Sequence, residues 1–222
     1  MDFSPLWISF KISFFSTFFT FFLGIFSAWK VGNAKRARAV IDSLLSLPLV
    51  IPPTVVGFFL LLIFSKNGWL GEFLSKIGIN PLFTWGGGVF SASLVSFPVM
   101  YRTMRGAFSQ IDPTIVSAAR TLGMSEISIF TKIMIPVSLP GIAAAVILSF
   151  ARALGEFGAT IMVAGNLPGK TQTMAVAIYT AMQSGNKSLA FKWVLIIFSI
   201  SAIILLLMNF VTERIFEKGK SR

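Results

Sequence analysis

The chain has 222 residues, of which 55% are hydrophobic and only 12% are charged, and its mean hydropathy is +0.82. A soluble domain carries about 25% charged residues, so this composition excludes an ordinary soluble domain and predicts a polytopic membrane protein. The sequence contains no cysteine and no histidine, which excludes disulfides, thiolate chemistry, His-assisted serine hydrolysis and His-liganded metal sites.

Five apolar stretches are long enough to cross a hydrocarbon core, which requires about 20 residues. The sequence contains no internal repeat and no separate soluble domain. It therefore predicts one all-α membrane domain over residues 1–222, with five to six transmembrane helices. The stretches cover about 8–29, 44–63, 85–104, 139–163 and 193–211.

Three prolines interrupt the second stretch, at Pro48, Pro52 and Pro53. Proline removes a backbone donor and kinks a helix, which a membrane segment tolerates where the freed groups are buried in protein or line a cavity. The prolines predict a helix kink here. A broken helix beside a transport pathway and a static kink that serves packing are both compatible with this pattern.

Residues 112–136, between the third and fourth stretches, predict a helical hairpin. Asp112 and Pro113 are typical of a helix start, because an N-cap acceptor precedes a proline at the first helical position. This helix is expected to run to about Leu122. Gly123 can then adopt the left-handed conformation that ends it.

The second arm of the hairpin is expected to begin at Ser125, as its N-cap, and to stop at Pro136. Ala118 and Ala119 in the first arm leave a low-relief patch that another protein could approach closely. The hairpin is therefore predicted to be a docking element.

Arg152 and Glu156 are the sharpest feature of the fourth stretch. They stand four residues apart and are expected to share a helix face. Charges at that depth are costly and usually face the bundle interior or a water-filled cavity. We interpret the segment from Arg152 through Gly155 and Glu156 to Thr160 as a pathway or gate element. An internal ion pair that only fixes packing is the alternative, and direct contact with a substrate is a further one.

Neither nucleotide binding nor catalysis is expected of this chain. The stretch from Gly165 to Thr171 ends like a phosphate-binding loop, but three residues separate its glycines where four are required. Asp2, Asp42 and Asp112 lie at or outside the ends of the apolar stretches, so paired carboxylates for intramembrane catalysis are missing. We therefore expect no enzyme activity, no catalytic residue, no metal site and no cofactor bound by this chain.

Lys and Arg are divided unevenly between two sets of loops: twelve lie in the set that includes the hairpin, and five lie in the opposite set. By the positive-inside rule, the N-terminus is predicted outside, and the hairpin and C-terminus are predicted in the cytoplasm. The basic residues flank apolar stretches and form no stripe that alternates with exposed aromatics. The net charge of +11 therefore indicates the lipid bilayer as a partner, and not nucleic acid.

The hairpin resembles the cytoplasmic loop of ATP-binding-cassette (ABC) importer permeases, Glu-Ala-Ala-x3-Gly-x9-Ile-x-Leu-Pro, and the resemblance extends over about residues 5–215. Serine replaces the glutamate of the family at position 117, which removes any salt bridge from that position, and Ile135 replaces its leucine. The resemblance implies an ATPase-coupling loop that contains Ser117, Ala118, Ala119, Arg120, Gly123, Ile133 and Pro136.

Three further stretches, 47–53, 96–100 and 150–160, resemble the molybdate group of these permeases, which extends to tungstate. Sulfate permeases are similar but usually have tyrosine at the position of Phe157. The resemblance implies a type I ABC importer permease in the cytoplasmic (inner) membrane. Its implied partners are a second copy of the chain, two cytoplasmic ATPase subunits that hold ATP and Mg, and an extracytoplasmic molybdate-binding protein.

Other functions remain open from the sequence. A sulfate or thiosulfate ABC permease is the first alternative. A secondary transporter or channel that uses Arg152 and Glu156 for ion coupling, and a structural membrane subunit of an unrelated complex, are the others. Dependence on a partner ATPase separates the ABC permeases from the last two.

Overall fold

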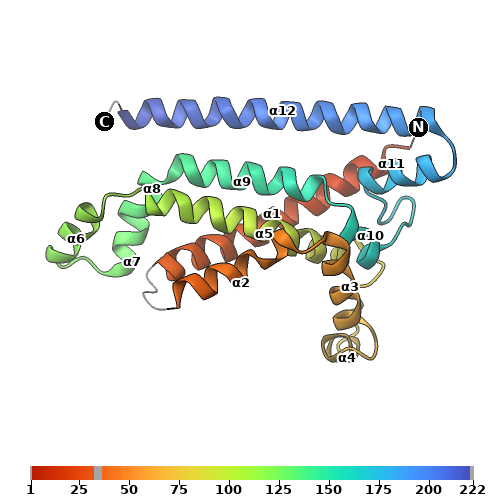
Figure 1. Ribbon diagram of the computed structural model, residues 1–222, viewed down its shortest axis with the longest axis horizontal. Coiled ribbons are helices and arrows are strands. Elements are labelled where there is room, and N and C mark those ends of the chain that lie inside the picture. The colour runs from red at the N-terminus through yellow and green to blue at the C-terminus, as the bar shows by residue number, and fades with distance from the viewer. Residues whose placement is uncertain (1, 33–36, 221–222) are drawn as a thin grey trace.

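In a computed structural model, which describes residues 2–32 and 37–220 and side chains as far as Arg214, every regular element is a helix (Figure 1). The predicted all-α class is confirmed. The longer helices are α1 (Ser4–Gly32), α2 (Arg38–Val50), α3 (Pro53–Phe64), α5 (Trp85–Ser109), α9 (Leu139–Leu154) and α12 (Lys187–Lys220). The shorter elements are α4 (Trp69–Lys76), α6 (Pro113–Thr121), α7 (Glu126–Ile129), a π-helical turn (Phe130–Met134), α8 (Ile135–Val137), α10 (Gly158–Ala164) and α11 (Met174–Gln183).

The long helices run along one axis of the molecule in alternating directions. α1 leads away from the N-terminal end, α2 returns toward it, α5 leads away again, and α9 returns (Figure 1). α12 then runs the full length to the C-terminus. The hairpin of α6 and α7 therefore lies at the same end as the C-terminus, whereas α10 and α11 lie near the N-terminal end.

The centre of the bundle is the contact between α1 and α5. The buried side of α1 is lined by small and hydroxyl residues, among them Ser16, Thr20 and Gly24. A Cβ on Gly24 would lie 2.7 Å from Cγ of Met100, and the Ser16 hydroxyl donates to the carbonyl of Val89 on α5 at 2.9 Å. Small residues let helices approach closely in a membrane, where apolar burial gives little drive for association.

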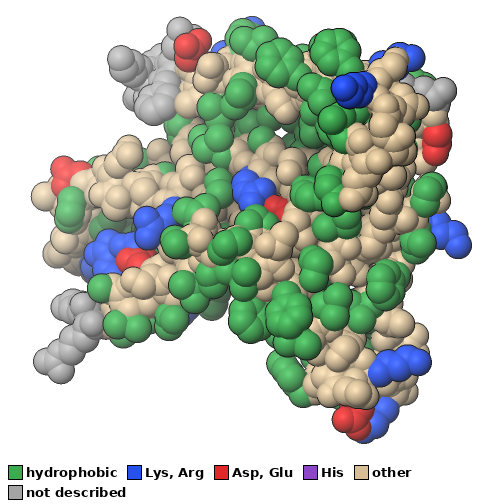
Figure 2. Space-filling model, turned by 45° about the vertical axis from the view of Figure 1, so that its right-hand side comes forward, with side chains coloured by type: hydrophobic (Ala, Val, Ile, Leu, Met, Phe, Trp, Pro, Cys, Tyr) green, Lys and Arg blue, Asp and Glu red, His purple; other side chains and the backbone are tan. Residues whose placement is uncertain are grey.

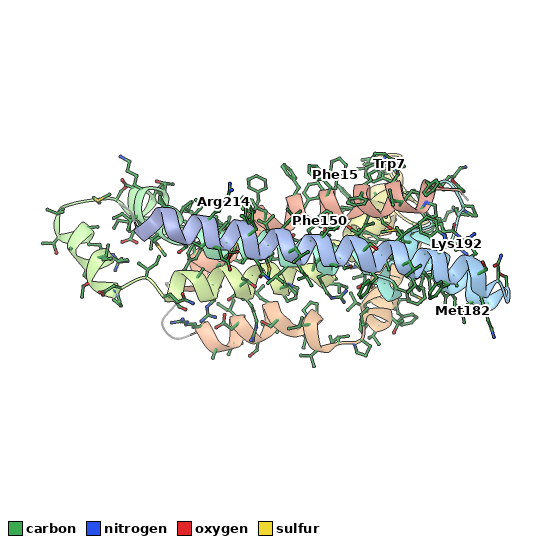
Figure 3. All side chains as sticks on the ribbon, turned by 90° about the horizontal axis from the view of Figure 1, so that it is seen from above. Trp7, Phe15, Phe150, Met182, Lys192 and Arg214 are labelled. Atoms are coloured by element: carbon green, nitrogen blue, oxygen red, sulfur yellow. The ribbon has the colours of Figure 1, made fainter. Side chains whose placement is uncertain are left out.

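Large apolar side chains cover the outside of the bundle. Phe14, Phe18, Phe22 and Phe26 are all exposed at four-residue spacing along α1. α12 lies along the bundle, with Lys192 near one end and Arg214 near the other (Figure 3). In the most apolar part of this helix, no residue is buried against the rest of the chain. Apolar faces of this length are expected to contact lipid or another membrane helix.

Two of the five predicted stretches are not continuous helices. Residues 44–63 are divided between α2 and α3, where the chain bends by 103°, and residues 139–163 are divided between α9 and α10. The other three stretches lie within α1, α5 and α12. Among the described residues, α1 and α12 are long and apolar enough to span a membrane alone. Two bent pairs, α2 with α3 and Glu126–Val137 with α9, meet the same criterion together.

Candidate functional site

The break between α2 and α3 lies at Ile51 and Pro52, which are both extended. Pro52 and Pro53 have no N–H to continue the hydrogen bonds of α2, and a residue before proline is disfavoured in the helical conformation. Pro48, in contrast, lies inside α2. The predicted kink therefore belongs to Pro52 and Pro53, and it is a complete break and not a bend within one helix.

The second break separates α9 from α10. The N–H of Gly155 still donates to the carbonyl of Ala151 at 3.2 Å, but Glu156 and Phe157 leave the helix before α10 begins at Gly158. Glu156 thus lies in the break. The prediction that Arg152 and Glu156 share a continuous helix face is wrong, because the helix ends between them.

Arg152 and Glu156 nevertheless form an ion pair, with Nη1 of the arginine 2.8 Å from Oε2 of the glutamate. The other carboxylate oxygen, Oε1, accepts the backbone N–H of Ala159 at 2.9 Å, so Glu156 also satisfies the start of α10. The glutamate side chain is 2% exposed and the arginine side chain 32%. The carboxylate is buried with both oxygens engaged, and the guanidinium keeps a face open.

The two breaks lie against each other. A Cβ on Gly57 of α3 would lie 2.8 Å from Cα of Ala159 on α10, and a Cβ on Gly158 would lie 3.1 Å from the backbone nitrogen of Thr54. The backbones of α3 and α10 are therefore in direct contact, which only glycine permits at these positions. We call residues 51–57 and 155–160 together the paired breaks.

The predicted gate residues do not all lie in one place. Arg152, Gly155 and Glu156 come together at the end of α9, where Gly155 is exposed. Thr160 lies in the first turn of α10, where it is 1% exposed, and its hydroxyl has no hydrogen-bond partner among the described residues. An orphaned buried hydroxyl beside the paired breaks marks a place where a water or a second conformation would satisfy it.

The hairpin has the predicted turn chemistry. The Asp112 carboxylate accepts the N–H of Thr114 at 2.8 Å, Gly123 has a φ of +78°, and the Ser125 hydroxyl accepts the N–H of Ser128 at 3.3 Å. The positive φ confirms the left-handed conformation that was expected of Gly123. These local contacts stabilise the turn without burial in the bundle.

An ion pair joins the two arms of the hairpin. Arg120 Nε and Nη2 donate to the two carboxylate oxygens of Glu126 at 2.7 and 3.1 Å. This hydrogen-bonded arginine holds the pKa of Glu126 below its usual value, and the N–H and hydroxyl of Thr114 do the same for Asp112. Both carboxylates are exposed at the surface and are ionised at neutral pH.

The predicted docking patch is smaller than expected. Ser117, Ala118 and Arg120 are exposed on α6, but Ala119 is only 4% exposed. The exposed large apolar side chains of the hairpin are Ile115, Leu122 and Ile127. The hairpin thus presents a mixed surface of small and apolar side chains.

Pro136 does not stop the second arm. Ile133 lies in the π-helical turn, Pro136 lies in α8, and the bend of 76° falls two residues later, at Ser138. A proline is tolerated near the start of a helical segment, and the π-helical turn before it changes the hydrogen-bond register. Only Ser138 therefore separates the second arm from α9, and the chain bends by 76° there.

Sequence reasoning missed a charged cluster between α2 and α5. Asp42 of α2 contacts both the guanidinium of Arg105 and the hydroxyl of Tyr101, and Arg102 Nε donates to the Ser46 hydroxyl at 2.7 Å. Figure 2 shows one group of Lys and Arg side chains with an acidic side chain among them, whereas other basic side chains on this face are scattered. The sequence signal for this cluster is a four-residue spacing on each helix, which places Asp42 and Ser46 on one face of α2 and Tyr101 and Arg105 on one face of α5.

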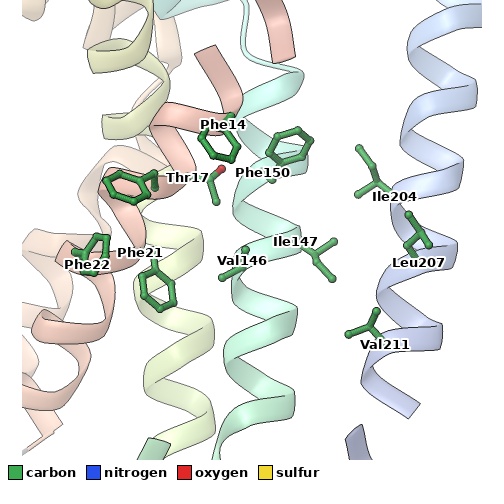
Figure 4. A pocket seen from close by; sticks show the side chains of 11 residues that line it. Phe14, Thr17, Phe21, Phe22, Val146, Ile147, Phe150, Ile204, Leu207 and Val211 are labelled. Atoms are coloured by element: carbon green, nitrogen blue, oxygen red, sulfur yellow. The ribbon is translucent and has the colours of Figure 1, made fainter. Parts of the chain in front are cut away.

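An apolar cavity of about 710 Å³ lies between α1, α9 and α12 (Figure 4). Its lining is apolar apart from Thr17, and Phe14, Phe21, Phe150 and Leu207 are typical members. A charged solute would leave its hydration shell there without compensation. This cavity is therefore no site for an ion, and the polar paired breaks remain the candidate site. Among the described side chains, no group of three His, Cys, Asp or Glu residues could hold a metal.

The family model described as "Binding-protein-dependent transport system inner membrane component" matches residues 20–218. The putative molybdenum transport system permease protein YvgM of Bacillus subtilis is 42% identical over 91% of this chain and 90% of that protein. The molybdenum transport system permease protein ModB of Escherichia coli K12 is 40% identical over 93% and 91%. The sulfate transport system permease protein CysT of the same strain is 32% identical over 91% and 73%.

Solved structures of other importers have the same fold. A chain of a bacterial ABC transporter that imports alginate matches 95% of this chain and 78% of its own length, with a TM-score of 0.77 at 19% identity. A chain of the MetNI methionine ABC transporter matches 95% of this chain and 94% of its own length, with a TM-score of 0.74 at 14% identity. At such identities the likeness concerns the fold alone.

Proposed function

Because this chain belongs to the family of binding-protein-dependent transport system inner membrane components, we propose that it is the permease subunit of an ATP-driven importer for molybdate. The observation that carries this proposal is the identity of 40–42% to two molybdenum transport permeases, over at least nine tenths of each chain. The sulfate permease is less similar and extends beyond the matched region. Tungstate, a tetrahedral dianion of the same kind, is a second expected cargo.

The proposed assembly follows the family. Two copies of this chain would form the pathway, two cytoplasmic ATPase subunits would bind ATP and Mg, and an extracytoplasmic protein would deliver the oxyanion. The excess of Lys and Arg at the hairpin end supports a cytoplasmic hairpin and C-terminus, with the N-terminus outside. The exposed hairpin surface is the proposed contact with the ATPase.

We propose that α9 transmits movement of the hairpin to the paired breaks. The second arm of the hairpin continues through α8 into α9, and Arg152 lies in the last turn of α9. A helix of 16 residues is about 24 Å long and moves as a rigid rod. When ATP binding closes the ATPase subunits, displacement of the hairpin would shift the Arg152–Glu156 pair against α3.

The Arg152 guanidinium is suited to brief contact with a dianion. One nitrogen is held by Glu156, and the partly open face could meet an oxyanion oxygen, while the glutamate limits the positive charge. Weak binding suits a pathway, because an ion that enters must also leave. Selection would then rest mainly with the delivery protein. If the ion pair were purely structural, a substitution that keeps its geometry would leave transport unchanged.

The first test is ATPase activity in liposomes that contain this chain and its ATPase, with the delivery protein loaded in turn with molybdate, tungstate or sulfate. Stimulation by molybdate or tungstate and not by sulfate is the expected result. Stimulation by sulfate alone would keep the importer mechanism and overturn the proposed cargo. The absence of any stimulation in a verified complex would favour a structural subunit.

A further inference from the structure

A second, polar cavity lies at the hairpin end of the bundle, away from the paired breaks. It measures about 440 Å³ and is enclosed by α5, the α8–α9 bend and α12. Water occupies about 30 Å³ per molecule in the liquid, so this space has room for a hydrated head group. Its polar lining comes from Arg102, Thr103, Gln110, Ser138 and Thr212.

The lining of this cavity is suited to a phosphate group. Arg102 uses Nε for the hydrogen bond to Ser46, and no hydrogen bond to its other two nitrogens occurs within the described part of the chain. The Thr212 hydroxyl is buried and has no partner among the described residues. Among the described residues that line the cavity there is no Asp or Glu, and the charged one is Arg102.

The start of α9 adds to this positive character. Ser138, Pro140 and Gly141 line the cavity, and they stand at the N-terminus of a helix of 16 residues. The N-terminal end of a helix carries partial positive charge and favours anions. Arginine, with several donors in a fixed plane, is well matched to phosphate oxygens.

The location indicates where the anion comes from. No residue in the most apolar part of α12 is buried against the rest of the chain, and Thr212 lies on this helix, next to the basic C-terminal segment. At the rim, Arg102 and Val137 are exposed. Anionic lipids are concentrated in the cytoplasmic leaflet, and basic pockets between membrane helices on that side bind lipid head groups.

We propose that this cavity binds the phosphate head group of an anionic membrane lipid, with Arg102 and Thr212 as its principal donors. The choice of a cytoplasmic-leaflet lipid rests on the topology given with the proposed function. The head group would contact Ser138, where the second arm of the hairpin bends into α9. Occupancy by lipid would therefore stiffen the segment that transmits hairpin movement.

The test is lipid retention by the complex of this chain with its ATPase, reconstituted in nanodiscs that contain phosphatidylglycerol and phosphatidylcholine. Native mass spectrometry of the released complex counts the lipids that remain bound. We expect the unsubstituted complex to retain phosphatidylglycerol in preference to phosphatidylcholine. Arg102→Gln should reduce that preference about five-fold, which corresponds to one lost basic contact.

Two further variants separate lipid binding from a general effect on folding. Gly106→Leu fills the cavity and keeps every charge, and a Cβ at Gly106 meets no atom within 4 Å, so this variant should fold and lose the preference. Arg214→Gln is the matched control, because Arg214 stacks on Phe210 and does not line the cavity. It should retain phosphatidylglycerol like the unsubstituted chain.

Three outcomes would overturn the proposal. The first is that the Gly106→Leu variant retains as much phosphatidylglycerol as the unsubstituted complex. The second is that Arg102→Gln and Arg214→Gln lose the same amount of phosphatidylglycerol. The third is displacement of the lipid by millimolar inorganic phosphate in the released complex. The last outcome would assign the cavity to a free anion. Retention is measured without molybdate or delivery protein. A preference for phosphatidylglycerol without molybdate-stimulated ATPase activity would therefore contradict the proposed function alone.

Discussion

Two carboxylates inside this bundle, Glu156 and Asp42, are each held by more than one partner. Glu156 is bound by Arg152 and by the N–H of Ala159, and Asp42 is bound by Arg105 and Tyr101. An unpaired charge at such depth would be strongly destabilising, whereas a pair that is fully hydrogen-bonded persists. The two carboxylates therefore act as connections between segments, at the α9–α10 break and between α2 and α5.

Glu156→Gln should separate the two contacts of this carboxylate, the ion pair with Arg152 and the hydrogen bond from the Ala159 N–H. The amide oxygen still accepts the Ala159 N–H, but Arg152 loses its charged partner. We expect a loss of about 1–3 kcal/mol in the free energy of unfolding, since Arg152 is partly exposed and its charge is screened. Thermal unfolding in detergent measures the loss, and basal ATPase activity of the complex should rise relative to stimulated activity.

The exposed pair of Glu72 and Lys76 provides the control for this variant. Glu72→Gln should change stability by less than about 0.5 kcal/mol, because a surface ion pair contributes little. Adding Arg152→Gln to Glu156→Gln should recover part of the lost stability. A change in oxyanion preference with unchanged coupling would contradict the role proposed for Glu156.

The Arg120–Glu126 pair of the hairpin predicts a pH dependence. The pKa of Glu126 is lowered in the folded hairpin, so its contribution is complete above the ordinary pKa of 4.5 and is lost as the pH falls through the folded value. Hydrogen exchange of residues 112–126, corrected for the intrinsic rate, should be unchanged from pH 8 to about pH 5.5 and faster below pH 4. Glu126→Gln should abolish this difference, and a transition near neutral pH would contradict the assignment.

At the scale of helices, the hairpin and the paired breaks are stabilised in different ways. The hairpin turn is set by local capping and by one glycine in the left-handed region. The paired breaks depend on glycines that allow two backbones from distant parts of the sequence to touch. The first arrangement can form within a short segment, and the second requires the assembled bundle.

Gly123→Val should disrupt the turn, because a β-branched residue is disfavoured at a φ of +78°. We expect a chain that still inserts in the membrane but loses most of its ATP-driven uptake. Gly123→Asn is the control, since asparagine tolerates the left-handed conformation and should keep uptake within about two-fold. Unchanged uptake by the valine variant would contradict the role of the hairpin as a rigid lever.

Gly57→Ala should force α3 away from α10, because its Cβ would lie 2.8 Å from Cα of Ala159. Overpacking of this kind costs about 1–3 kcal/mol, which thermal unfolding would detect. Gly32→Ala is the control, since a Cβ there meets no atom within 4 Å. If both variants unfold at the temperature of the unsubstituted protein, the close contact of the paired breaks is not important for stability.

At the scale of the whole molecule, the two termini lie at opposite ends of the long axis, and the hairpin shares the end that carries the C-terminus (Figure 1). Two polar regions lie along this axis, the paired breaks and the cavity at the hairpin end. α9 connects them. A displacement at the hairpin would therefore reach both regions through a single helix.

The orientation in the membrane can be measured directly, because the chain has no native cysteine. Ser117→Cys on the hairpin and Ser184→Cys in the loop before α12 are both exposed positions. A membrane-impermeant maleimide should label the first only in inside-out vesicles and the second only in right-side-out vesicles. The reverse pattern would overturn the predicted topology, and with it the leaflet assigned to the bound lipid.

The sequence by itself determined the helical membrane class, the family and the conformation of the hairpin turn. Hydropathy, N-caps at Asp112 and Ser125, and Gly123 act over a few residues, so their effects can be predicted locally. Only the tertiary structure decided that the fourth predicted span breaks at Glu156 against α3, and that Asp42 pairs with Arg105. Both depend on contacts between segments far apart in the chain, and the spacing of residues within one helix does not identify the partner segment.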